Sequence, residues 1–593
     1  MSFSSHTFFS KPVQSLKDII YNTFDWIYAH TPIPFTTPHD SRIAHLPGHP
    51  ILGKIPVVAE KNGLSRLTAD MYPKGKAAPS GISSVKFANE TTYLLTKLSH
   101  VLQMLMLNND NIDRGNLMLG FNSLLGDENV FSLISNTPEW RAKRKSIEPQ
   151  LGSKQAVEKL IVPMQDILDG YVERLEEDGT IESLEVLMAE IAINIYLRTQ
   201  FDSQPIDRES SARIFNTYNN ALDAASDPWN IIRANIAHSK LGPILEILFN
   251  QYRVNAPLEK EQAKIDNALK DCFLKPNLDK NNNVLFNEEL DKVLGSSFVR
   301  KENNDFENPF VARDENYAEL ESKIHDLSLL VLAAHETTSR TLLFIMCLLL
   351  NEKNAAVLAK FLEAIDKHAP QNGQWTLEDL KKMSFLDEII EEAFRLYPTA
   401  PLLARIVTED FVLMDIPVWK TRQEYEKFKD ERDKTKDIII PRGKAIHISP
   451  WAMHRDEDLF KDALSFKPER HHVAEDKESK ENSASSDMLT FGRGLRRCPG
   501  EQFARQEIKL VILKLFQKLN WKILATVPKD KPKDRSCFGY LKSVFLGSNE
   551  DSAYSAPDDC LMRFTLRPTQ DIRVKVMPRE PRLEQESTLR RRV

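Results

Sequence analysis

Cysteine is scarce in this sequence. Among 593 residues there are five cysteines, which are Cys272, Cys347, Cys498, Cys537 and Cys560. Their odd number and scattered positions exclude a disulfide framework and a zinc site of the usual paired spacing. This usage indicates a reducing compartment. An excess of basic residues is lacking too. The formal net charge is −6, so the composition gives no reason to expect a nucleic-acid partner.

The N-terminal region has no long uncharged apolar run. Because a membrane span needs about 18 or more such residues, the sequence predicts neither a transmembrane anchor nor a signal peptide there. Apolar residues do recur at helical spacing, at Val13, Leu16, Ile19, Ile20, Phe24 and Ile27. Two interpretations stay open: a helix that lies on a membrane surface, or a helix that packs on its own protein.

Helical periodicity dominates from about residue 87 to about residue 400, and short β-type runs follow it. We expect strands at Phe411–Leu413, Ile438–Ile440, Ala445–Ile448, Met562–Leu566 and Arg573–Val576. Polar stretches near 275–310, 419–437 and 471–487 are typical of insertions, and the second is predicted to be an exposed helix or loop. The sequence therefore predicts a mainly α fold with a small β region.

One cysteine lies in a glycine-punctuated loop, Phe491–Gly500, directly before an apolar helical stripe. The glycines Gly492, Gly494 and Gly500 allow backbone conformations and close approaches that a Cβ would block. A cysteine just before a helix N-terminus is biased towards the thiolate, so Cys498 could serve as an axial ligand of haem iron. The alternative is a buried cysteine in a tight turn.

The stretch Leu327–Leu350 reads as a central helix with a polar step in its middle. Ala333 and Thr337 share a face, where the small alanine would admit a flat ligand. A hydroxyl beside the Glu336 carboxylate can relay protons in a dry cavity. The alternative is a polar step that is satisfied within a core helix.

Two further pairs share helix faces. Glu392 and Arg395 lie three residues apart just before Pro398, which alone indicates an ordinary ion pair. Trp140 and Arg144 lie four apart, so an indole N–H and a guanidinium could bind one carboxylate together.

Taken in order, these elements resemble the cytochrome P450 family of haem-thiolate enzymes. The family's F-x-x-G-x-R-x-C-x-G pattern is matched by Phe491, Gly494, Arg496, Cys498 and Gly500. The remaining motifs are matched by Glu392 and Arg395 (E-x-x-R), Trp140 and Arg144 (W-x-x-x-R), His454-Arg455-Asp456 (H-R-D), Phe466–His471 (P-E-R-F-like) and Ala333, Glu336, Thr337 and Thr338 (A-G-x-E-T-T). Two positions depart from the pattern: Ala334 replaces a glycine, and His471 replaces an aromatic residue.

The resemblance covers roughly residues 45–580, with residues 1–44 as an anchor-like segment and connector and 581–593 as a tail. It implies a cytochrome P450 fold with haem b between the central helix and the helix after the cysteine loop. Cys498 would bind the iron, and Phe491 would pack near the sulfur. The remaining implied cofactor contacts are Arg496, Trp140, Arg144 and Arg405 with the propionates, Ala333 and Ala334 at the oxygen site, and Gly494 and Gly500 in the loop.

The resemblance also implies functional roles. Glu336 and Thr337 would deliver protons at the oxygen site, and Glu392, Arg395 and Arg470 would form a structural network behind the haem. The implied activity is the insertion of one oxygen atom of O₂ into an apolar organic molecule, with electrons from NADPH through a separate P450 reductase. The implied substrate contacts include Thr399–Leu403. The location implied is intracellular, either soluble or peripheral on the cytosolic face of the endoplasmic reticulum.

Two alternatives to this function stay open. A haem-thiolate isomerase or dehydratase would keep Cys498 but would need neither O₂ nor a proton relay. A non-catalytic haem-binding protein would keep the same loop without coupling NADPH to oxidation.

Overall fold

A computed structural model gives the fold of the chain. It describes residues 43–45, 80–87, 90–107, 112–113, 124–125, 129–135, 137–201, 203–225, 256–269, 271–272, 315–419, 422–472, 488–528, 560–562, 565–568 and 570–579. The expected N-terminal helix, the insertion near 275–310, most of the stretch 471–487 and the tail 581–593 lie outside the described residues.

Helices make up most of the described chain. The long ones are α6 (Pro138–Leu151), α8 (Ile161–Asp178), α9 (Leu184–Phe201), α10 (Arg208–Ala225), α13 (Ala256–Leu269), α15 (Glu315–Leu350), α16 (Ala355–His368), α18 (Ser384–Leu396), α19 (Arg422–Glu431) and α22 (Glu501–Lys518). The short ones are α4 (Leu98–Leu102), η2 (Gln103–Leu107), α7 (Lys154–Lys159), η7 (Glu352–Asn354), α17 (Leu377–Lys382), η8 (Lys434–Lys436), α20 (Pro450–Met453), η9 (Pro468–His471) and η11 (Gly494–Arg496).

The strands form one larger sheet and three small ones. Their bounds are β1 (Ala44–His45), β2 (Ile82–Phe87), β3 (Glu90–Leu95), β4 (Ile112–Asp113), β5 (Thr180–Ile181), β6 (Leu403–Val407), β7 (Phe411–Leu413), β8 (Ile438–Ile440), β9 (Ala445–Ile448), β10 (Leu519–Pro528), β11 (Cys560–Met562), β12 (Leu566–Pro568) and β13 (Gln570–Pro578). The larger sheet has the order β1-β2-β3-β9-β6-β4, in which β3 and β9 run parallel and β9 and β6 antiparallel. The others are β10-β13-β5, β11-β12 and β7-β8.

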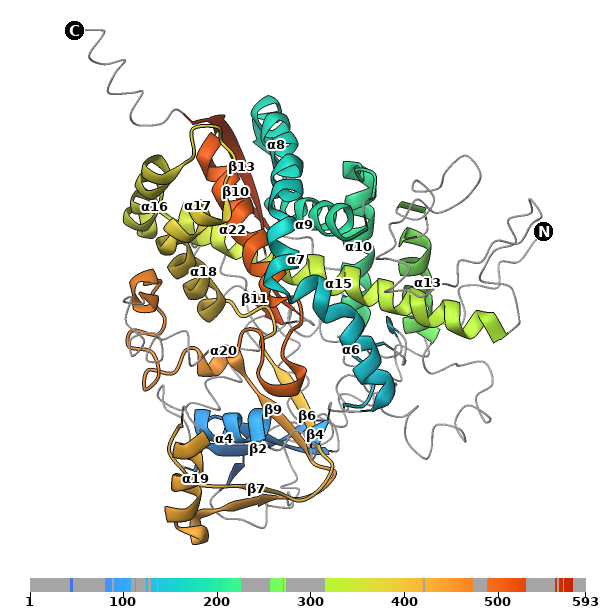
Figure 1. The fold of residues 1–593 in the computed structure, drawn as a ribbon, viewed down its shortest axis with the longest axis vertical. Helices are drawn as coiled ribbons and strands as arrows, with labels where there is room; N and C mark the ends of the chain where they lie inside the picture. The colour runs from blue at the N-terminus through green and yellow to red at the C-terminus, as the bar shows by residue number, and fades with distance from the viewer. Residues whose placement is uncertain are drawn as a thin grey trace, which may run out of the picture.

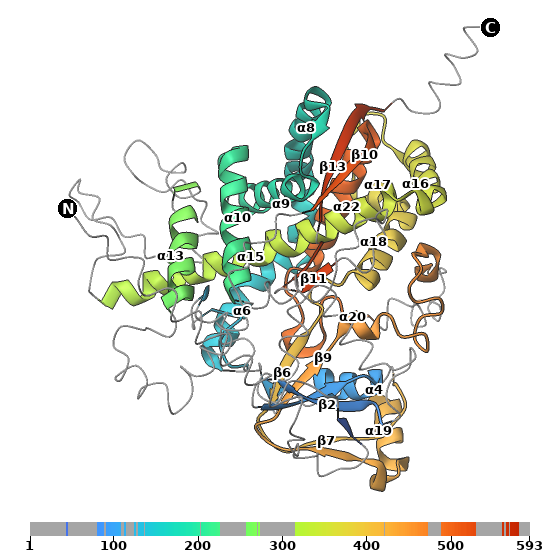
Figure 2. The same cartoon turned by 180° about the vertical axis from the view of Figure 1, so that it is seen from behind.

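The larger sheet lies at one end of the molecule with α4 and α19 beside it, most of the other helices lie towards the opposite end, and α15 crosses between them (Figures 1 and 2). Helix α15 has apolar residues over most of its surface because it packs against α9, α18 and α22. Its segment Asp326–Leu350 is long and apolar enough to cross a membrane, yet 78% of its apolar 18-residue stretch is buried inside the protein. Among the described residues, α15 is therefore the central core helix.

The β7–β8 pair shows that short runs of β-type residues predict strands well. In both strands the outer residues are buried while the middle ones, Val412 and Ile439, are exposed and face each other across the pair. The expected strands at Phe411–Leu413, Ile438–Ile440 and Ala445–Ile448 are confirmed. The expected helical character from residue 87 is wrong at its start, where β3 occupies Glu90–Leu95.

The charged insertion near 419–437 contains helix α19, as expected for an exposed helix or loop. Its aromatic residues are nevertheless buried: Trp419 and Tyr425 are only 7% and 6% exposed, and their rings pack 5.2 Å apart. This contact fastens the insertion to the core beside the larger sheet. The predicted mainly α fold with a small β region is confirmed.

Candidate active site

The cysteine loop is a tight turn that ends in helix α22. Gly492 and Gly494 have φ of 68° and 69°, a left-handed conformation that favours glycine. The Cys498 N–H donates to the Phe491 carbonyl at 2.9 Å, which closes the loop. Gly500 differs from Gly492 and Gly494, because its φ is −87° and an added Cβ would stand 3.9 Å from the Cys498 sulfur, an ordinary contact; its implied contact with haem stays a prediction.

The Cys498 thiol is accessible, although protein surrounds it densely enough that burial raises its pKa. The backbone N–H of Gly500 lowers the pKa but does not outweigh burial. The helix N-terminus therefore does not produce the thiolate by itself. A bound metal ion would, because a coordinating thiol is deprotonated by the ion's own charge.

Helix α15 carries an accessible strip in the middle of an otherwise buried stretch. Ala333 is exposed, and Ala334 and Thr337 are half-buried, whereas the neighbouring Leu332 is fully buried. The Thr337 hydroxyl donates to the Ala333 carbonyl at 2.8 Å. This strip joins small side chains to one hydroxyl, so it can admit a flat ligand and hold a proton beside it.

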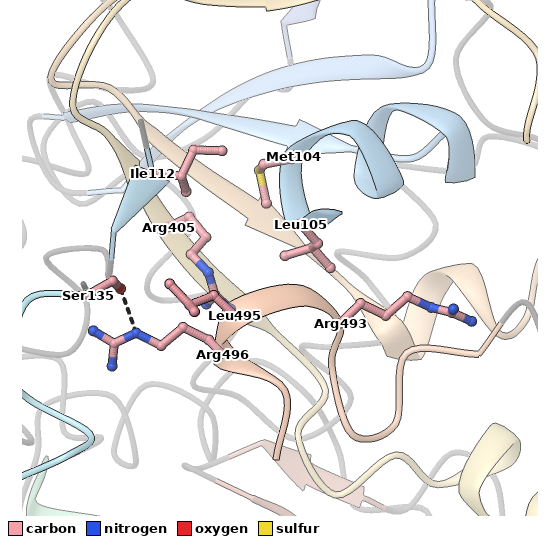
Figure 3. A pocket seen from close by; sticks show the side chains of 8 residues that line it. All are labelled: Met104, Leu105, Ile112, Ser135, Arg405, Arg493, Leu495 and Arg496. Atoms are coloured by element: carbon pink, nitrogen blue, oxygen red, sulfur yellow. Dashed lines mark hydrogen bonds between the residues drawn. The ribbon is translucent and has the colours of Figure 1, made fainter. Parts of the chain in front are cut away.

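A small hollow with an open mouth lies between the cysteine loop and the larger sheet (Figure 3). Its walls are Met104, Leu105, Ile112, Ser135, Arg405, Arg493, Leu495 and Arg496. Burial lowers the pKa of Arg405 to about 10, and that of Arg496 to about 10 as well. Asp113 is the carboxylate near both, and it lies 3.3 Å from the Arg496 guanidinium. A buried excess of positive charge of this kind favours an anionic ligand group.

Arg496 is held by many oxygen atoms. Its guanidinium donates to the Ser135 hydroxyl at 2.6 Å and to the Val130 carbonyl at 3.1 Å, and also to the Leu133 carbonyl. It lies 5.0 Å from the centre of the Trp140 ring. The Trp140 ring thereby stabilises the Arg496 guanidinium through a cation–π contact.

The sequence predicts that Trp140 and Arg144 bind one carboxylate together. In the structure each of them bonds to a backbone carbonyl instead. The Trp140 indole N–H donates to the Val130 carbonyl at 3.1 Å, and Arg144 donates to the Arg497 carbonyl at 2.5 Å. Of the four side chains expected to hold propionates, Arg405 and Arg496 line the hollow. Trp140 and Arg144 instead join α6 to the cysteine loop.

Glu336 occupies a buried ionic network. The side chain is 1% exposed, and its carboxylate lies 3.2 Å from Arg340 Nε and 3.2 Å from Arg567 Nε. The Thr565 hydroxyl donates to it at 2.6 Å. Burial alone would raise the pKa of Glu336, but Arg340 and Arg567 outweigh burial and hold it well below its usual range.

This geometry argues against Glu336 as a proton donor, because a carboxylate clamped by two guanidinium groups stays ionised at neutral pH. Thr337 belongs to the accessible strip, as does Ala333 on the same face, whereas Glu336 belongs to the interior. The sequence did not reveal Arg340, Thr565 and Arg567 as partners of Glu336, or Glu185 as a partner of Arg340. Arg340 could have been found from its i, i+4 spacing to Glu336.

The structure brings Glu392, Arg395 and Arg470 together in one cluster, in which Glu392 and Arg395 are fully buried and Arg470 is partly buried. Arg395 donates to both Glu392 oxygens at 2.8 Å, and Arg470 Nε adds a bond at 3.0 Å. His471 joins them, with its Nε2 2.8 Å from Glu392 Oε2. Burial opposes ionisation, yet the bonds from Arg395 and His471 lower the pKa of Glu392 to about 2. The histidine in the place of an aromatic residue thus becomes a polar member of the network.

The residues present fit haem. An accessible thiol, the strip of small side chains on α15 and two arginines beside the cysteine loop supply an iron ligand, a flat apolar wall and counter-charges for carboxylates. Among the described residues there is no cluster of three or more His, Cys, Asp or Glu that could hold a bare metal ion. The site is thus that of a haem-thiolate protein.

Comparison with known proteins agrees with this class. The family described as Cytochrome P450 matches residues 44–422 and 429–544. Cytochrome P450 CYP82J17 of Trigonella foenum-graecum is 31% identical over 195 residues, which are 33% of this chain and 32% of that protein. The (13S,14R)-13-O-acetyl-1-hydroxy-N-methylcanadine 8-hydroxylase CYP82X1 of Papaver somniferum is 23% identical over 85% of this chain and 89% of its own length.

The fold comparison points the same way. The heme domain of a cytochrome P450DA mutant has a TM-score of 0.60 at 16% identity, and the match covers 91% of this chain and 98% of that one. The chain belongs to the cytochrome P450 family, as its motifs predict. Members of this family are haem-thiolate monooxygenases that hold haem b and use O₂ with electrons derived from NADPH.

Proposed function

We propose that this protein is a haem-thiolate monooxygenase that inserts one oxygen atom of O₂ into an apolar organic substrate. The accessible Cys498 thiol, held by the closed loop after Phe491, is the observation that carries the proposal. Haem, when bound, supplies the activation of O₂, in which one oxygen atom enters the substrate and the other leaves as water. The chain supplies the iron ligand, the positioning of substrate and a controlled supply of protons.

Thr337 is the residue we assign to proton handling. Its hydroxyl lies on the accessible strip of α15 and can both donate and accept a hydrogen bond. The small Ala333 beside it leaves room for O₂ or substrate. Thr337→Ala should release more hydrogen peroxide per NADPH consumed, and an unchanged ratio of product to peroxide would remove Thr337 from this role.

The iron ligand is tested by spectroscopy. Cys498→Ala should abolish the red-shifted Soret band of the reduced CO complex, since that band needs a thiolate ligand. If the variant keeps the band, Cys498 is not the ligand. Product that forms without O₂ or NADPH in the wild-type protein would favour an isomerase or dehydratase instead.

The electron donor would dock on the side of Cys498. Exposed Arg141 and Lys145 on α6, together with Arg497 beside the cysteine, form a basic surface there, and Arg144 joins it to the loop. Such a surface favours an acidic partner such as an NADPH-dependent reductase. Lys145→Glu should slow reduction by the reductase and weaken its salt dependence, whereas Lys353→Glu, in η7, should not.

The location we propose is intracellular, with the protein either soluble or peripheral on the endoplasmic reticulum. Fractionation of the full-length chain without detergent tests this. Release from membranes by salt or carbonate supports a peripheral protein, and extraction by detergent alone would contradict the proposal.

A further inference from the structure

We propose that Glu336 is a positioning residue that fixes strand β12 beside the accessible strip of α15 and thereby sets which substrates fit. The inference rests on the proposed function, because it concerns the substrate side of the same site. It assigns to Glu336 a specificity role.

Two side-chain hydrogen bonds carry the link between helix α15 and the strand. The Thr565 hydroxyl and the Arg567 Nε reach the same Glu336 oxygen, at 2.6 Å and 3.2 Å. Arg567 also lies 3.3 Å from Asp223 on α10. Thr565 and Arg567 are buried, at 1% and 7% exposure, so solvent does not weaken these bonds.

Strand β12 needs such an anchor. It pairs with β11 in a two-stranded sheet, and a sheet of this size is marginal on its own. On the other side, the Leu566 N–H donates to the Thr399 carbonyl at 3.0 Å. The strand is therefore held between the segment after α18, at Thr399, and the middle of α15, at Glu336.

Both anchor points adjoin the site. Glu336 directly precedes Thr337, whose hydroxyl lies on the accessible strip. Thr399 leads into β6, whose Arg405 lines the hollow in Figure 3. A shift of β12 would therefore change the space between the strip on α15 and the segment that leads into β6.

Charge balance identifies which partner depends on Glu336 most. Arg340 has a second buried acidic partner, Glu185 of α9, and a further bond of 2.9 Å to Asn219. The second acid near Arg567 is Asp223, whose side chain is 40% exposed. Loss of the Glu336 charge would leave Arg340 paired but would leave Arg567 held by a partly solvated carboxylate. We therefore expect loss of the Glu336 charge to loosen strand β12 more than helix α15.

The test compares Glu336→Gln and Arg567→Gln, with Thr565→Val as a milder variant that removes one hydrogen bond. Hydrogen exchange of the segment 565–568 is measured first, and it needs no substrate. We expect about tenfold faster exchange of the Leu566 amide in both charge variants, with the reduced-CO band unmoved. Thr565→Val should show a smaller change in the same direction.

The second measurement uses imidazole and 4-phenylimidazole, which bind haem iron through nitrogen. Imidazole should bind the variants as it binds wild type, whereas the affinity for the bulkier probe should change about tenfold. A double-mutant cycle of Glu336 and Arg567 should be strongly non-additive. If Glu336→Gln shows altered coupling to peroxide while Arg567→Gln shows neither faster exchange nor altered probe binding, the proposal is overturned. A wild-type protein whose reduced CO complex lacks the red-shifted Soret band would instead contradict the proposed function.

Discussion

The Leu489 backbone N–H donates to His454 Nε2 at 3.0 Å in the interior of the protein. His454 is completely buried, and its carbonyl accepts a bond of 2.7 Å from Arg395. The Leu489 carbonyl in turn accepts from the Gly492 N–H at 2.9 Å, and the Phe491 carbonyl accepts from Cys498. A run of hydrogen bonds and short chain segments thus leads from the Glu392 network to the iron ligand. His454 positions the start of the cysteine loop.

His454→Leu should destabilise the protein and release part of the thiolate ligand. The change leaves the Leu489 N–H buried without an acceptor, which costs about 1–3 kcal/mol. Denaturant unfolding measures the loss, and the reduced-CO spectrum should show a growing band near that of thiolate-free haem. His454→Gln, whose amide oxygen can accept the same bond, is the matched control. Equal behaviour of the two variants would contradict the role of the hydrogen bond.

The same histidine makes stability depend on pH. Burial lowers the pKa of His454 to about 3, far below the ordinary value of 6.5. Because the folded pKa is the lower one, the unfolded chain takes up a proton first, and stability falls as pH drops from about 6.5 towards 3. Each such histidine adds a slope of up to about 1.4 kcal/mol per pH unit in that window.

Other buried histidines act in the same direction, since burial also lowers the pKa of His447 to about 3 and that of His100 to about 4. Unfolding free energy measured between pH 7 and 5 should therefore show uptake of several protons. In His454→Gln that uptake should fall by about one proton. An identical slope in the variant would mean that His454 is protonated in the folded protein.

Glu392→Gln should be among the most damaging single changes in the chain. Glu392 and Arg395 are both 0% exposed, and Arg395 holds the carbonyls of His454 at 2.7 Å and Ser465 at 3.1 Å. Removing one partner of a buried ion pair costs about 3–5 kcal/mol, so we expect a lowered unfolding midpoint and poor haem retention. Glu363→Gln, at an exposed position of α16, is the matched control and should behave as wild type.

The sequence predicts features that depend on residues close together in the chain, and it does not predict pairings between distant segments. Short runs of β-type residues predict β7 and β8, and i, i+3 spacing predicts the pair of Glu392 and Arg395. Strand β3 pairs with the preceding β2 and, on its other side, with the distant β9, whose Ala445 pairs with Thr92, and this second pairing is not visible in the local sequence. The same limit hid the partner of Glu336 at Arg567, 231 residues away. Local periodicity carries no information about such pairings.

Arg405→Gln and Arg144→Gln separate the two kinds of arginine near the haem site. Arg405 lines the hollow beside Arg496, and burial lowers its pKa to about 10, so its charge is poorly compensated without an anionic ligand. Arg144 is bonded to the Arg497 carbonyl at 2.5 Å and to Glu148 at 2.5 Å, so its charge is already paired with a carboxylate of the protein. Transfer of haem to an excess of apomyoglobin measures how firmly the propionates are held.

We expect Arg405→Gln to speed this transfer about tenfold or more, because a charge-assisted bond to a carboxylate is worth about 1.5–3 kcal/mol. Arg144→Gln should change the rate much less and should act instead on reduction by the electron donor, since it joins α6 to the residue next to Cys498. If both variants lose haem at the same rate, Arg144 turns towards a propionate when haem is bound, and the division between the two arginines is wrong.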